Sequence, residues 1–350
     1  CIRDRIPNNR LDDRFVEYFD ETNKFRQATD YTTQNLTGIY LIEYSLNSGE
    51  PGGISEPAFL RKVEEFVQWY RQQPLVLHVN SITDIMKRLN RNMHGDADSW
   101  YRLPEQRDLA AQYLLLYEFS LPFGLDLNNQ INVQKSSTRI TVTLQSVSTK
   151  ELLELEEKVQ AWLHEHAPEM KIEGASPSVM FAHIGERNIK AMLKGTTLAL
   201  VMISFILIFA LRSLRIGGLS LLPNLVPIGM AFGIWGLLVG EVGLALSVVS
   251  GMTLGIVVDD TVHFLSKFLR ARREKGMNAE DAVRYAFSTV GTALWVTSLV
   301  LIIGFGILAF SHFQLNAGMG LLTAITIGLA LLADFLFLPP LLMLFGGKKS

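Results

Sequence analysis

The chain has 350 residues, of which 49% are hydrophobic and 19% charged, and its formal net charge at pH 7 is −2. Its one cysteine, Cys1, excludes an internal disulfide framework. The net charge argues neither for nor against nucleic acid, and we expect no nucleic-acid partner. These averages hide a division, because charges are spread through residues 1–190 whereas residues 195–346 are mostly long apolar runs.

The first part of the chain, residues 1–176, predicts an α+β domain. Helices are expected at Asp12–Arg26, Glu56–Gln73, Ile82–Asn92, Glu105–Leu116 and Lys150–His166, and strands at Thr37–Leu46, Leu75–Val79, Arg139–Leu144 and Met170–Glu173. The order strand–helix–strand occurs at 37–79 and again at 139–173, which is typical of two small ferredoxin-like βαβ units. The scattered histidines predict neither a catalytic nor a metal site.

The second part predicts a bundle of five transmembrane helices. Residues 177–194 have a helical pattern that leads into the first apolar segment without a breaker. The spans are expected at about 195–211, 219–240, 244–267, 290–310 and 317–345. No signal-peptide pattern precedes the domain and the chain begins with Cys1, so we expect a fragment or a processed product, with a lipid-modified mature terminus as the alternative.

Basic residues predict the orientation of these spans. Arg212 with Arg215, the run Arg270–Lys275, and Lys348 with Lys349 all fall on one side of a five-helix arrangement. Basic loops stay in the cytoplasm. Residues 1–190 are then expected to be extracytoplasmic.

The third span carries the most informative pattern. Gly251, Gly255, Asp259 and His263 recur every fourth residue and so lie along one face of a helix, small above and ionisable below. Asp260 adds a second carboxylate. A carboxylate within the apolar slab is costly unless it is paired, hydrated or protonated, which favours a functional role. The alternative is that Asp259 reaches water at the cytoplasmic end of the helix.

The neighbouring residues carry open alternatives. Gly251 and Gly255 are expected to allow close helix packing. His263, one turn below Asp259, either extends a hydrogen-bonded relay or serves packing.

Polar residues on the last two spans leave alternatives open as well. Thr297 and Ser298 either donate hydrogen bonds to the carboxylates or join helices together. Asp334 either faces the same polar core or is a structural or interfacial acid.

The segment Gly251-Met-Thr-Leu-Gly255-Ile-Val-Val-Asp259-Asp260-Thr-Val-His263-Phe resembles the carboxy-terminal half of a resistance-nodulation-division (RND) transporter. It is closer to the MMPL and hopanoid-exporter-like "predicted exporter" branch than to multidrug pumps. Supporting segments are Arg212-Ser-Leu-Arg-Ile-Gly217 through Pro223-Asn224, Thr297-Ser298 with Gly304-Phe305, and Ala333-Asp334-Phe335 with Leu338-Pro339.

The resemblance implies an extracytoplasmic porter domain followed by the last five of twelve spans. It implies a proton relay that includes Asp259, Asp260, His263 and Asp334, with Thr297 and Ser298 as hydrogen-bond partners. Multidrug members carry a Lys in the helix that here has two Asp.

The expected function is export of hydrophobic or amphiphilic molecules, lipids in particular, driven by the proton motive force. We expect no enzyme activity, cofactor or metal, and the chain lacks the nucleotide-binding pattern GxxxxGK[ST]. The expected partners are membrane lipids, the substrate, a missing amino-terminal half and further copies in a dimer or trimer, and the expected location is the inner membrane. The alternatives are a lipid- or sterol-sensing receptor that does not pump, and an accessory protein-translocation factor.

Overall fold

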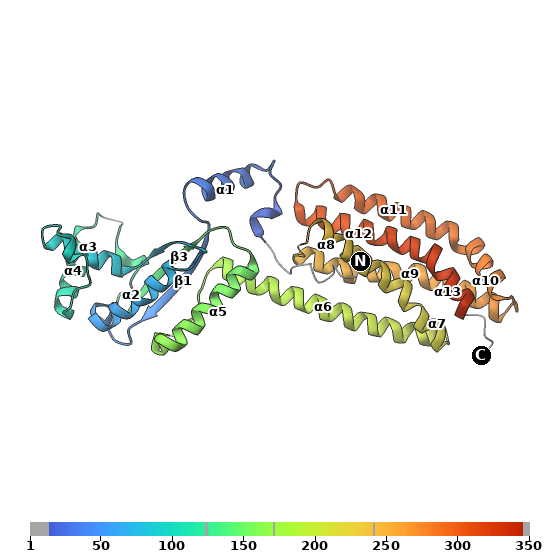
Figure 1. Ribbon diagram of the computed structural model, residues 1–350, viewed down its shortest axis with the longest axis horizontal. Helices are drawn as coiled ribbons and strands as arrows, with labels where there is room; N and C mark the ends of the chain where they lie inside the picture. Colours follow the sequence, from blue (N-terminus) through green and yellow to red (C-terminus); the bar gives the residue numbers. More distant parts are fainter. Residues whose placement is uncertain (1–13, 123–124, 171, 241, 346–350) are drawn as a thin grey trace. The chain divides into compact units, whose positions relative to one another are not determined.

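The computed structural model describes residues 14–122, 125–170, 172–240 and 242–345 (Figure 1). The expectations for Cys1, for the start of the first helix at Asp12, and for Lys348 and Lys349 lie outside these residues. The chain divides into two compact units. One is Gln27–Ile184, and the other runs from Gly185 onward and includes the segment up to Arg26.

The unit Gln27–Ile184 contains a three-stranded antiparallel sheet of order β1-β3-β2, with β1 at Tyr40–Asn47, β2 at Val76–Asn80 and β3 at Ser137–Leu144. Strands predicted to lie in two βαβ units therefore pair in one sheet, and the ferredoxin-like subdivision is not confirmed. The predicted strand at 170–173 is not formed among the described residues, where Pro168–Met170 makes a 3-10 turn.

Five helices accompany this sheet. They are α1 (Lys24–Asn35), α2 (Pro57–Arg71), α3 (Ile82–Met93), α4 (Arg107–Ser120) and α5 (Thr149–His166). Four were predicted within a few residues, but the predicted helix over 12–26 was wrong. Phe15–Tyr18 forms a 3-10 turn instead, and the Asp20 carboxylate accepts hydrogen bonds from the backbone and hydroxyl of Thr22, which closes a turn before α1.

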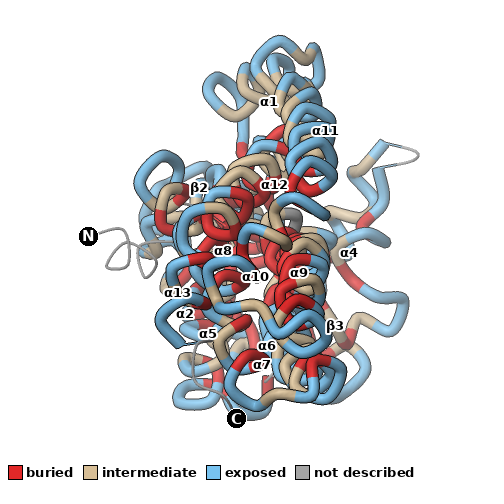
Figure 2. The backbone as a smooth tube through the Cα atoms, turned by 90° about the vertical axis from the view of Figure 1, so that its right-hand side faces the viewer, coloured by how far each residue is buried: buried red, intermediate tan, exposed pale blue. Residues whose placement is uncertain are grey.

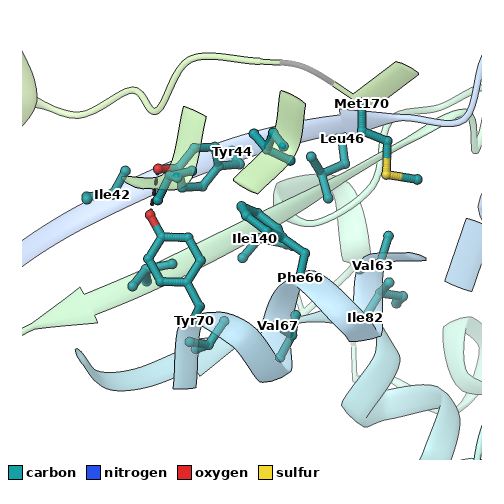
Figure 3. Packing of buried hydrophobic residues seen from close by; sticks show 14 of the residues in the cluster. Ile42, Tyr44, Leu46, Val63, Phe66, Val67, Tyr70, Ile82, Ile140 and Met170 are labelled. Atoms are coloured by element: carbon teal, nitrogen blue, oxygen red, sulfur yellow. Dashed lines mark hydrogen bonds between the residues drawn. The ribbon is translucent and has the colours of Figure 1, made fainter. Parts of the chain in front are cut away.

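The core of this unit is built from the inner face of the sheet and one side of α2 (Figure 3). Every second residue of β1 is buried, as expected for a strand with one covered face. Tyr44 from β1 and Tyr70 from α2 meet there with their hydroxyl oxygens 2.6 Å apart. Burial raises the pKa of both phenols, so the pair shares its protons as neutral groups.

The second unit is almost entirely helical. Its elements are α6 (Pro177–Ala210, which begins in the first unit), α7 (Leu214–Leu219), α8 (Leu221–Leu238), α9 (Leu244–Arg273), α10 (Ala279–Ala286), the π-helical turn η7 (Phe287–Gly291), α11 (Thr292–Leu308), α12 (Gln314–Leu332), the π-helical turn η8 (Ala333–Phe337) and α13 (Leu338–Phe345). Together they supply five segments long and apolar enough to cross a membrane, and the chain is a multi-pass membrane protein.

The helix α12 is the centre of this bundle, because it packs against α8, α9 and α11. Half of its span is buried, whereas only 6% of the span in α6 is buried. Figure 2 shows buried and exposed positions alternating along α9. An apolar helix with so little buried surface is suited to face lipid, so α6 lies at the edge of the described bundle.

The Tyr44–Tyr70 pair generates a stability prediction. Tyr70→Phe leaves the Tyr44 hydroxyl buried without its partner and is expected to cost about 1–3 kcal/mol of unfolding free energy. Tyr44→Phe should act alike. The double variant should cost less than the sum of the two, since no orphaned hydroxyl remains.

The measurement is the unfolding midpoint followed by tryptophan fluorescence, because Trp69 lies 5.3 Å from the Tyr70 ring. Tyr31→Phe is the matched control, since Tyr31 is 64% exposed and should be neutral. Strictly additive single effects would show that the two hydroxyls are not coupled.

Candidate functional site

Three consecutive residues of α9 point in three directions, because each helical residue turns by about 100°. The side chain of Asp259 is 72% exposed. Asp260 is partly buried, and Thr261 is fully buried. The two adjacent carboxylates therefore do not form one site, and each meets different neighbours.

Asp259 lies on the outer face of α9 with His263, whose Nε2 is 3.5 Å from Asp259 Oδ1. The His263 side chain is 60% exposed. Gly251 and Gly255 continue the same exposed face toward the start of the helix. These four residues are called the outer stripe below.

Asp260 faces α11. The hydroxyl of Ser298, which is buried, donates a hydrogen bond of 3.0 Å to Asp260 Oδ2. Thr297 does not reach a carboxylate, because its hydroxyl donates to the carbonyls of Ala293 and Leu294 in its own helix. Of the two candidate donors, Ser298 makes the contact.

Asp334 is 2% exposed and belongs to a buried polar cluster that joins three segments. The hydroxyl oxygen of Thr261 in α9 lies 3.0 Å from Asp334 Oδ1 in η8 and 2.8 Å from Asn224 Oδ1 in α8. Asp334 Oδ2 and Asn224 Nδ2 have no hydrogen-bond partner among the described residues. The carboxyl of Asp334 also interacts electrostatically with that of Asp260, so the cluster borders the Asp260–Ser298 pair.

The π-helical turn that carries Asp334 has a local cause. Pro339 and Pro340 have no N–H to donate to the carbonyls of Phe335 and Leu336, and their rings crowd the preceding turn. Widening the turn to the π-helical form relieves that crowding, and such turns are rare and frequent at functional sites. Asp334 therefore lies in a turn whose regular backbone hydrogen bonding is interrupted.

The glycines of α9 have unequal surroundings. A Cβ at Gly251 would lie 3.2 Å from Thr196 Oγ1 of α6, while a Cβ at Gly255 would meet nothing within 4 Å among the described residues. A much closer helix approach occurs at Gly320 of α12. A Cβ there would lie 2.6 Å from both the Phe305 carbonyl oxygen and the Leu308 Cβ of α11.

Asn224 and Thr261 were missed by the sequence reasoning. The sequence places Asn224 in a motif without giving it a role, and it singles out the two aspartates but not Thr261, which follows them. A signal existed in the helical repeat, which turns Thr261 away from both carboxylates, but the sequence does not say which helices lie there. In the described parts of the chain, no three His, Cys, Asp or Glu side chains converge as a metal site would require.

Comparison with known proteins points to one family. A profile of the MMPL family matches residues 132–350. A protein of Methanocaldococcus jannaschii that is named as a membrane protein is 28% identical over 149 residues, which are 43% of this chain and 38% of that protein. The match therefore spans less than half of either chain.

The glycine geometry predicts opposite outcomes for two matched substitutions. Gly320→Ala forces α11 and α12 apart and is expected to destabilise the bundle by about 1–3 kcal/mol, the usual range for overpacking. Gly255→Ala should leave its stability unchanged, because the added methyl meets open space.

Thermal unfolding of the purified protein in detergent measures both, with the fluorescence of Trp235 as the signal, since this ring lies beside α12 at Gly318. Equal midpoints for the two variants would contradict the close approach of α11 and α12.

Proposed function

Because the chain belongs to the MMPL family, we propose that it is part of a proton-motive-force-driven exporter of hydrophobic or amphiphilic molecules, lipids in particular. The observation that carries this proposal is the outer stripe. It places a carboxylate and an imidazole on the exposed face of a helix that spans the membrane. Ionisable groups at such positions mark proton or ion pathways.

The outer stripe is expected to contact another protein segment or water rather than lipid. Asp259 and His263 would be costly against lipid tails, so this face is expected to meet polar groups or water. Gly255, where an added Cβ would meet nothing within 4 Å, leaves the face smooth enough for another helix backbone to approach closely, whereas α6 already lies beside Gly251. We assign this contact to the amino-terminal set of spanning helices that the RND resemblance implies, with an oligomeric contact as the alternative.

The carboxyls offer a stepwise route for a proton. Asp259 and His263 would exchange it on the outer face, Asp260 would hold it beside Ser298, and Asp334 would receive it in the bundle core. Neutralising a buried carboxylate removes a strong penalty on its surroundings, so each transfer shifts the preferred helix packing. Energy from the proton gradient thereby becomes movement of helices.

The proposed orientation rests on the basic residues after α6 and α9, because basic loops stay in the cytoplasm. The unit Gln27–Ile184 is then extracytoplasmic and serves as the porter domain, and the membrane is the inner membrane. The finer expectation that this domain is made of ferredoxin-like subdomains belongs to the same proposal.

The decisive experiment compares energy sources. Cells carrying the complete transporter should export a fluorescent lipophilic probe, and a protonophore should stop this export while cellular ATP stays constant. A protein that binds lipid but gives no energised export would favour the lipid-sensing alternative. Impaired secretion of proteins without any probe export would favour the translocation factor.

The topology is predicted as follows. In a Cys1→Ser background, a membrane-impermeant thiol reagent added from outside should label Val133→Cys, at a site that is 92% exposed. Glu274→Cys, whose native side chain is 64% exposed, should be labelled only after the membrane is opened. The reverse pattern would overturn the orientation.

The relay is predicted to need both α9 carboxylates. Asp259→Asn or Asp260→Asn should lower export to background, because the amide keeps the shape and hydrogen-bonding capacity but cannot exchange a proton. Protein level and thermal stability should stay near normal, since removing a charge from the membrane interior does not cost folding energy.

The matched control is Glu280→Gln, which neutralises an exposed acid on the short helix α10 and should leave export unchanged. Normal export by the double variant Asp259→Asn/Asp260→Asn would refute the relay. Loss of export together with loss of protein would show that these acids hold the helices together instead.

A further inference from the structure

The buried cluster of Asn224, Thr261 and Asp334 has more hydrogen-bond acceptors than protons. Thr261 Oγ1 is within reach of Asn224 Oδ1 at 2.8 Å, Asp334 Oδ1 at 3.0 Å and the Val257 carbonyl at 3.2 Å. A hydroxyl carries a single proton. With Asp334 ionised, the single Thr261 proton would have to serve these three oxygens. The two contacts left without a proton would then bring oxygen lone pairs face to face.

A proton on Asp334 removes this conflict. The carboxyl O–H then donates to Thr261 Oγ1, and the Thr261 hydroxyl is free to donate to Asn224 Oδ1, so each short oxygen–oxygen contact contains one proton. Asp334 Oδ2 becomes an ordinary carbonyl oxygen, which tolerates burial without a partner far better than an anionic oxygen does.

We propose that these three residues form a reversible hydrogen-bond chain in which Asp334 holds a proton in this conformation, and that the Asn224 amide turns over when the proton leaves. The chain rests on the proposed function, in which Asp334 exchanges a proton. After proton loss, Thr261 donates to the Asp334 carboxylate. Asn224 then rotates its amide by half a turn so that Nδ2 donates to Thr261.

The unpartnered amide nitrogen fits this second arrangement. Asn224 is completely enclosed, and its Nδ2 has no acceptor among the residues that the structure describes. Burying such a donor is unfavourable, and native structures rarely keep one without a reason. In the second arrangement the same nitrogen acquires Thr261 Oγ1 as its acceptor, so each amide orientation matches one charge state of Asp334.

Few charged groups face the cluster. The sequences of α8, α11 and α13 contain no ionisable residue. The α9 helix contributes Asp260, whose charge acts on Asp334. Since like charges repel, the two carboxyls titrate as a coupled pair. Asn224 and Thr261 thus act as positioning residues that report the proton of Asp334 to α8 and α9.

The test is infrared difference spectroscopy of the purified full chain, which needs no substrate and no transport. At neutral pH the carbonyl stretch of one protonated carboxyl should be present and should shift on transfer to D₂O. Asp334→Asn should remove it, whereas Asp259→Asn, on the outer stripe, should keep it. Wild-type bands in a folded Asp334→Asn variant would overturn the proposal.

The positioning roles have their own readouts. Thr261→Val should move the Asp334 band to the frequency of a free carboxyl, and Thr261→Ser, which restores the hydroxyl, should return it. Asn224→Leu removes the amide that donates to Thr261 when Asp334 is ionised, and so it destabilises the ionised form. The band of protonated Asp334 should therefore persist to higher pH. Unchanged band positions and pH profiles in all three variants would overturn the hydrogen-bond chain.

A bound cation is the competing explanation for a ring of oxygen atoms. Replacing choline by sodium in the buffer should leave the Asp334 band intact if a proton occupies the cluster. Loss of the band on sodium addition would overturn the proposal in favour of an ion site. Loss of transport with the band intact would instead count against the proposed function alone, so the two failures are distinguishable. Thermal unfolding of each variant verifies folding.

Discussion

The membrane-spanning bundle depends on one constraint: polar groups within the hydrocarbon layer must find their partners inside the protein, because no bulk water is present there. Several Ser and Thr hydroxyls of the spans donate to a backbone carbonyl of their own helix, four residues earlier. Examples are Thr197 to Leu193, Ser204 to Leu200, Thr253 to Val249 and Thr326 to Leu322. The hydroxyl of Ser298 departs from this pattern and donates to Asp260 on another helix. The hydroxyl of Thr261 is within reach of the Val257 carbonyl in its own helix and also contacts Asp334 on another segment.

The prolines locate the polar cluster. Asn224 lies in the first turn of α8 between Pro223 and Pro227, and Asp334 lies in the π-helical turn ahead of Pro339. At both places the backbone ladder lacks donors, so the helix deforms there at lower cost than elsewhere. Thr261 on the continuous helix α9 thus contacts Asn224 and Asp334, each of which lies where proline interrupts the backbone hydrogen bonding of its helix. The proposed change of charge at Asp334 would act at a place where the helix is already irregular.

Local features of the sequence predicted much of this architecture. Apolar runs predicted five spans, and periodicity predicted four of the five helices in the unit Gln27–Ile184, because both signals are contained within each segment. Strand pairing was not predictable, since β1 and β3 lie about ninety residues apart and nothing in either strand specifies its partner. The prediction of the first helix was wrong because the Asp20 carboxylate accepts a hydrogen bond from the Thr22 N–H. The resulting turn separates the 3-10 turn at Phe15–Tyr18 from α1.

The site divides in the same way. The spacing of four residues predicted that Gly251, Gly255, Asp259 and His263 share a face of the helix, and in the structure all four residues are exposed. The role of Asn224 could not be predicted, because a polar residue acquires meaning only from the helices packed around it. Thr261 becomes informative only once α8 and η8 are known to lie on its side of α9.

Two adjacent carboxylates on one helix must face about 100° apart, and this geometry gives α9 its place between two environments. Asp259 belongs to the outer stripe and Asp260 to the bundle interior. A proton that passes from one to the other moves around the helix rather than along it. It changes the charge on the outer face and in the core in opposite senses. In the proposed relay, whatever covers the outer stripe would sense the charge of the core through this single transfer, without a large movement of α9 itself.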